Sequence, residues 1–133
     1  MNYRFPIYWH IALPPTPNTW HAIAREVFDP DEHVPAFVIT LPRSIYSSSS
    51  DERNFQGGTI VSLLQMIHEF YQGPATSEDI NGIVNNLSSQ SSRRERFIRL
   101  LQRQEAGEII RRIDVLGRAS TCEEIRDSKL LVE

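Results

Sequence analysis

Residues 57–80 read GGTIVSLLQMIHEFYQGPATSEDI and carry the clearest structural signal in the chain. Thr59 is a favourable N-cap residue, and the apolar side chains after it recur at helical spacing, so we predict a helix with one buried face. That face consists of Ile60, Leu63, Leu64, Ile67, Phe70 and Tyr71. Gly73-Pro74 predicts the end of the helix, because glycine tolerates the left-handed conformation that follows many helices and proline cannot continue one.

A second helix is predicted directly after this stop. Thr76 or Ser77 can cap it, and the acidic side chains of Glu78 and Asp79 fall in its first turn, where the helix dipole favours negative charge. Its apolar face consists of Ile80, Ile83, Val84 and Leu87. Because only about three residues join the two helices, we expect them to pack against each other.

A third helix is predicted from Arg93 to about Glu105, after a polar linker at about 88–92. Its inward-facing side chains are Phe97, Leu100 and Leu101. Gly107 marks its end, because a glycine commonly follows the last turn of a helix.

Two strands are predicted after this helix. Residues 109–116 alternate between two faces and stop at Gly117, which is the pattern of a half-buried strand. Residues 129–132 are mostly apolar and predict a short final strand.

The N-terminal residues also alternate, with large side chains on one face at Tyr3, Phe5, Ile7, Trp9 and Ile11. This period of two predicts a strand, and Pro6 places it at the edge of a sheet because proline cannot donate a ladder hydrogen bond. Tyr8 and Trp9 point to opposite faces of such a strand. One of these rings can enter the core, and we expect the other to contact a second chain, so both are candidate binding residues.

The middle of the chain gives a mixed signal. Residues 36–41 are rich in β-branched and aromatic side chains and predict a strand buried at Phe37, Ile39 and Leu41. The serine-rich stretch at about 46–56 predicts a mobile, solvated loop. Residues 18–35 are ambiguous, although Thr19 can cap a short helix that runs to Val27.

Together these elements predict one α+β domain over residues 1–133, with a small antiparallel or mixed sheet packed against two to three helices. A chain of 133 residues is close to the common size of a single domain. We expect the two helices that begin after Thr59 and Thr76 to cover one face of the sheet. We expect the third helix to cross back and deliver the strand at 109–116.

The order of these elements resembles an uncharacterised domain family of mushroom-forming fungi. The resemblance rests on the aromatic strand before Leu13-Pro14-Pro15, and on Pro35-Ala36 leading into Phe37–Leu41. It also rests on the helix from Gly58-Thr59-Ile60 to Phe70-Tyr71 before Pro74-Ala75-Thr76, and on Arg112–Gly117. The stretch Trp20–His33 departs from the family's pattern. No activity is established for the family, so the resemblance implies a fold and not a function.

Composition favours a reducing compartment and no cofactor. Cys122 is the single cysteine, so it cannot form an intramolecular disulfide, and the sequence holds no Cys/His cluster of zinc-ligand spacing. No window approaches the ~18 consecutive apolar residues of a membrane helix, and the first residues lack the apolar stretch of a signal peptide. We expect a cytoplasmic protein, with the nucleus as the alternative, and no membrane partner.

No catalytic pattern is complete in the sequence. His68-Glu69 matches the first half of a zinc-protease helix motif, but position 72 is glutamine, which cannot replace the second histidine ligand. Glu123 and Glu124 beside Cys122 disfavour a reactive thiolate, so an ordinary thiol is expected there. We therefore predict no catalytic, cofactor-binding or metal-binding residues.

Charge is concentrated in one basic segment of an acidic chain. The net charge is −3, yet residues 93–118 hold eight Lys/Arg against four Asp/Glu. Arg96, Arg99 and Arg103 share one helix face and predict an exposed guanidinium stripe that can bind phosphate or an acidic partner. The acidic balance and the lack of interleaved aromatics count against nucleic acid.

These features favour a non-enzymatic protein-interaction domain that binds another protein or a second copy of itself through the N-terminal aromatic strand, forming a homodimer. Two alternatives stay open. The first is binding of nucleic acid or a phosphorylated or acidic ligand through the helix Arg93–Arg103. The second is a small hydrolase with an unrecognised His/Glu site.

Overall fold

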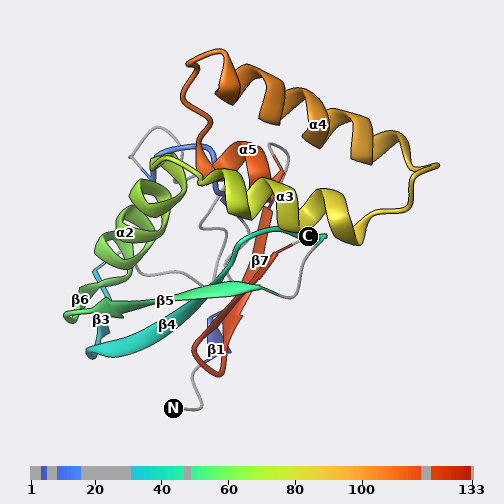
Figure 1. Ribbon diagram of the computed structural model, residues 1–133. Coiled ribbons are helices and arrows are strands. Elements are labelled where there is room, and N and C mark those ends of the chain that lie inside the picture. Colours follow the sequence, from blue (N-terminus) through green and yellow to red (C-terminus); the bar gives the residue numbers. More distant parts are fainter. Residues whose placement is uncertain (1–3, 6–8, 16–30, 47–48, 118–120, 133) are drawn as a thin grey trace.

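The computed structural model describes residues 4–5, 9–15, 31–46, 49–117 and 121–132, and it has an α+β fold (Figure 1). Its main sheet is mixed and has the strand order β1-β7-β8-β4-β5, with β2 also pairing with β7. These strands are β1 (Arg4–Phe5), β2 (Trp9–His10), β4 (Phe37–Pro42), β5 (Ser50–Phe55), β7 (Thr121–Arg126) and β8 (Lys129–Val132). The strands β3 (His33–Val34) and β6 (Gly58–Thr59) form a separate antiparallel pair.

Helix α2 (Ile60–Gln72) confirms the prediction made from the sequence. The hydroxyl of Thr59 accepts a hydrogen bond from the backbone N–H of Ser62, which satisfies one of the free donors at the helix start. The six side chains predicted to face inward are those that are buried: Ile60, Leu63, Leu64, Ile67, Phe70 and Tyr71. They pack with Trp9 of β2, Ile39 of β4 and Ile125 of β7 in the core between the helix and the main sheet.

A second apolar cluster lies between α3 (Ser77–Asn86) and α4 (Ser92–Glu105), so α3 packs chiefly against α4. The prediction that α3 packs against α2 was therefore wrong. Thr76 caps α3 as predicted, and Asp79 completes a capping box by accepting from the backbone N–H of Thr76. Figure 1 shows the helices on one side of the sheet, with α4 on the far side of α3 from the strands.

The segment predicted as a mobile loop at about 46–56 contains a strand. β5 pairs along its full length with β4, from Ser50 opposite Pro42 to Phe55 opposite Phe37. Phe55 is the only buried side chain of β5, because this strand lies at an edge and most of its side chains face water. Charged, polar edge strands are a common protection against pairing with other chains, and the composition of such a strand is easily taken for a loop.

The prediction of a strand at 109–116 was wrong, because Arg112–Leu116 forms the short helix α5. The carboxylate of Asp114 accepts a hydrogen bond from the backbone N–H of Arg111, and this local bond favours a helix start over an extended chain.

The neighbours of β8 in the sheet are β7 and β4, and β7 and β8 form a hairpin whose turn is Asp127-Ser128, both with positive φ. The strand predicted at 129–132 is confirmed as β8.

The N-terminal strand lies at a sheet edge among the described residues, as predicted, because β1 and β2 pair only with β7. Trp9 and Ile11 are buried and His10 between them is exposed, which confirms the predicted alternation. The possible helix from Thr19 to Val27 lies outside the described residues.

Candidate functional site

An open cleft lies where the end of α4, the segment before α5 and α5 itself meet the last turn of α2. Its volume is about 430 Å³, and its lining includes Gln72 of α2, Arg103 of α4, Ile109, Arg111 and Asp114. We call this feature the α4–α5 cleft. Ile109 is 76% exposed, the largest exposed fraction among the exposed large apolar residues that the structure describes. Ala12 also lines the cleft, and Leu13 beside it is exposed, so apolar surface is present on two sides.

Polar contacts hold the walls of the α4–α5 cleft in place. Arg103 and Glu108 form a bidentate ion pair, with N···O distances of 2.6 and 2.7 Å. Hydrogen bonding to Glu108 raises the pKa of Arg103. Arg111 donates to the side-chain oxygen of Gln72 at 2.8 Å. These bonds fix the backbone on both sides of Ile109, so its exposed side chain projects from a supported segment.

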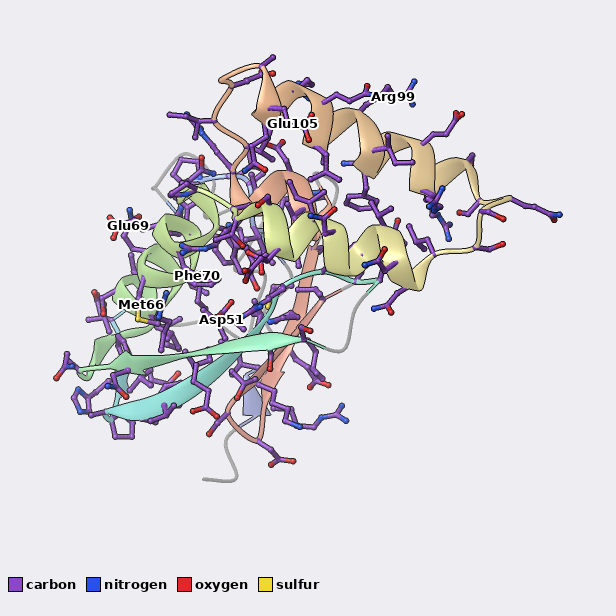
Figure 2. The ribbon with its side chains drawn as sticks, in the orientation of Figure 1. Asp51, Met66, Glu69, Phe70, Arg99 and Glu105 are labelled. Carbon is purple, nitrogen blue, oxygen red and sulfur yellow. The ribbon has the colours of Figure 1, made fainter. Side chains whose placement is uncertain are left out.

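A smaller hollow lies between α5, the start of β5 and the C-terminal half of α2. Its accessible volume is about 10 Å³, roughly the space of one water molecule. Arg43 in its wall donates to both carboxylate oxygens of Asp51 at 3.0 and 3.1 Å and to Asp79 at 3.0 Å. Hydrogen bonding to Asp51 is the largest cause of the raised pKa of Arg43. Figure 2 shows Asp51 and Phe70 close to this junction.

Tyr71 closes the hollow on its inner side. Its hydroxyl donates to the backbone carbonyl of Pro42 at 2.6 Å, which ties α2 to the end of β4. Burial raises the pKa of Tyr71, because the charged phenolate is poorly solvated there. The ring is therefore a neutral hydrogen-bond donor that belongs to the core.

The predicted arginine stripe is only partly a free surface. Arg103 is paired with Glu108, and Arg96 is half-buried, with its guanidinium over the ring of Phe97 and a donor 3.4 Å from the carbonyl of Asp114. Arg99 is exposed, and its side chain makes no hydrogen bond or ion pair with the part of the chain that the structure describes (Figure 2). The three residues therefore do not act as one exposed stripe.

The two aromatic candidates of the N-terminal strand have different outcomes. Trp9 is 2% exposed, and its indole N–H donates to the carbonyl of Leu13 at 3.0 Å, so its side chain belongs to the core. The expectation that Trp9 contacts a partner is therefore corrected, because the core already surrounds the ring. Tyr8 lies outside the described residues.

None of the histidines that the structure describes lines either of these two features. Nδ1 of His68 lies 2.9 Å from the carbonyl oxygen of Ile11, so this nitrogen carries the proton and donates. His10 contacts the hydroxyl of Thr121 at 3.2 Å.

Within the described ranges, no group of three or more His, Cys, Asp or Glu side chains is placed to hold a metal ion. None of the helices in the described part of the chain is long and apolar enough to cross a membrane.

Cys122 is fully buried, which leads to a testable expectation. In native buffer, a thiol reagent such as dithionitrobenzoate should react with it only at the rate at which the structure opens. Because the chain has one cysteine, the absorbance change reports this site alone. Reaction with the folded protein as fast as with the denatured protein would contradict the buried placement.

The sequence did not reveal the α4–α5 cleft. The strand predicted at 109–116 includes Ile109, and the alternation of that segment does not indicate that this side chain is exposed beside a cleft. The only feature of the sequence that points to the cleft is Gly107, which ends α4 and separates it from the segment that carries Ile109. Comparison with known proteins supplies no further indication, because no family model, curated protein or solved structure matches the chain.

Proposed function

We propose that this protein is a non-enzymatic protein-interaction domain and that the α4–α5 cleft is its contact surface. The single observation that carries the proposal is Ile109, an apolar side chain 76% exposed at the lip of a cleft of about 430 Å³. Single exposed apolar residues are common on protein surfaces, but one on a braced segment beside a cleft matches the anchor of a protein interface.

The chemistry of the cleft favours a protein partner. Its lining combines apolar side chains at Ala12 and Ile109 with two arginines, Arg103 and Arg111, and two carboxylates, Glu108 and Asp114. A central apolar contact with a charged rim is the usual composition of a protein interface. Membership of the fungal family, a cytoplasmic or nuclear location and self-association through the N-terminal strand all stay predictions.

The alternatives have less support. Ligand binding by the helix Arg93–Arg103 requires free guanidinium groups, and the contacts of Arg96 and Arg103 with the protein itself reduce their number. A hydrolase requires an activated group in a cleft, and neither His10 nor His68 lines the α4–α5 cleft or the hollow beside Arg43.

The first test asks whether the partner is a second copy of the chain. Sedimentation velocity of the wild type should show self-association, and Ile109→Asp should weaken it by about tenfold or more, since a charge at an interface centre is desolvated without a partner. Ile45→Asp is the matched control, because Ile45 is also exposed and apolar but does not line the cleft. Tyr8→Glu tests the N-terminal strand in the same assay.

The second test applies if the wild type is monomeric. A photo-crosslinking amino acid at position 109 should capture a specific protein in cells of the natural host, and the same group at position 45 should not. The captured protein must then bind the purified domain, with an affinity that Ile109→Asp lowers by about tenfold. The proposal fails if the wild type is monomeric and both positions give the same adducts.

A further inference from the structure

Two arginine side chains from different elements stack on one buried aromatic ring. The guanidinium carbon of Arg112 on α5 lies 4.4 Å from the centroid of the Phe70 ring, and that of Arg53 on β5 lies 5.0 Å from it. Phe70 is 8% exposed and belongs to α2. We call Arg53 and Arg112 the Phe70 arginine pair. Both guanidinium groups therefore border the same ring.

No carboxylate among the described residues lies within ion-pairing distance of the Phe70 arginine pair. The guanidinium group of Arg112 donates one hydrogen bond, to the carbonyl of Phe70 at 2.9 Å, and the side chain of Arg53 makes only the ring contact. The nearby carboxylates of Asp51 and Asp79 are already held by Arg43. Most of the donors on each guanidinium group are therefore free of protein partners.

The charges around the ring do not balance. Arg43, Arg53 and Arg112 contribute three positive charges, and Asp51 and Asp79 contribute two negative ones, which leaves an excess of one positive charge. An excess of positive charge near the ring favours the binding of an anion there.

We propose that the Phe70 arginine pair binds a small oxyanion, either a carboxylate or a phosphate group. A guanidinium group presents paired N–H donors in a planar fork that matches two oxygens of such an anion. Stacking on Phe70 restricts the motion of both guanidinium groups before the ligand binds, and this lowers the conformational entropy that is lost on binding. Arg112 also lines the small hollow beside Arg43, which gives one anion oxygen or a water molecule a place to sit.

The site is independent of the proposed partner surface. Arg112 and Val115 line the hollow, whereas Arg111, Ile113 and Asp114 line the α4–α5 cleft, so α5 contributes to both features. An anion can bind whether or not the cleft holds a protein, and the two proposals can fail separately.

The test is a titration of the folded protein with inorganic phosphate and, separately, with sodium acetate at constant ionic strength, followed by the arginine Nε–Hε resonances in NMR. We expect saturable shifts at Arg53 and Arg112, with an affinity on the order of millimolar. Arg99 is the matched internal control, because it is exposed and makes no bond with the described residues. Tighter binding of phosphate would assign a phosphate ligand, and tighter binding of acetate would assign a carboxylate.

Two variants separate a specific site from general attraction to positive charge. Arg53→Lys and Arg112→Lys keep the charge but remove the fork, so each should weaken binding by about tenfold. Arg99→Lys should leave it unchanged. Arg53→Lys is the safer variant for folding, because the side chain of Arg53 makes no hydrogen bond to the described protein. Shifts that never saturate with either anion, or lysine variants that bind as the wild type does, would overturn the proposal.

Discussion

Leu64→Ala is expected to lower the free energy of unfolding by about 2–5 kcal/mol. Leu64 is 0% exposed and packs in the cluster that joins α2 to the main sheet. Removing its branched end takes away apolar contacts and leaves a cavity that a close-packed core fills only in part. Urea denaturation followed by circular dichroism measures the change. Ile67→Ala, at a site equally buried, is expected to lose a similar amount.

Glu69→Ala is the matched control on the same helix. Glu69 is exposed, and its carboxylate accepts a hydrogen bond from the side-chain amide of Gln65 at 3.1 Å. Loss of this hydrogen bond should change the free energy of unfolding by no more than about 0.5 kcal/mol. If Leu64→Ala costs as little as this control does, α2 is not the central helix of the core.

The helices were predictable from the sequence because each carries a local signal. For α2, the N-cap Thr59, the apolar spacing and the Gly73-Pro74 stop all agree, and agreement of independent local signals is typical of a well-specified element. The same holds for α3, where Thr76 and Asp79 form a capping box. What these signals cannot predict is which helices pack together. The connections on both sides of α3 are short, so it can pack against α2 or α4, and these local signals do not distinguish the two.

The errors in the strands have a different cause. β5 has a polar composition and is held as a strand by its pairing with β4, so its structure depends on a neighbour rather than on its own residues. Residues 112–116 alternate as a strand does, but the bond from the backbone N–H of Arg111 to the carboxylate of Asp114 starts a helix there. In both segments, the conformation is determined by a contact that the spacing of apolar residues in the sequence does not reveal.

The candidate sites were less predictable than the fold for the same reason. The Phe70 arginine pair joins β5 and α5, the two elements whose structure the sequence did not predict. Phe70 was correctly placed on the buried face of α2, but nothing in its own helix indicates which cations cover it. A site assembled from three separate elements becomes visible only when their packing is known.

Trp9→Ala is expected to destabilise the protein by about 3–5 kcal/mol, because Trp9 is a large, fully enclosed side chain at the edge of the main sheet. The substitution also removes the indole donor to the carbonyl of Leu13, which ends the strand in a turn. Trp9→Phe should lose less, since a phenyl ring fills most of the space but lacks the N–H group. Urea denaturation together with sedimentation velocity separates a core role from an interface role. Substitution of a core residue lowers the free energy of unfolding and leaves the association constant of the folded protein unchanged. If Trp9→Ala instead kept the wild-type unfolding free energy and dissociated an oligomer, the ring would belong to an interface, and the placement of β2 against the core would be wrong.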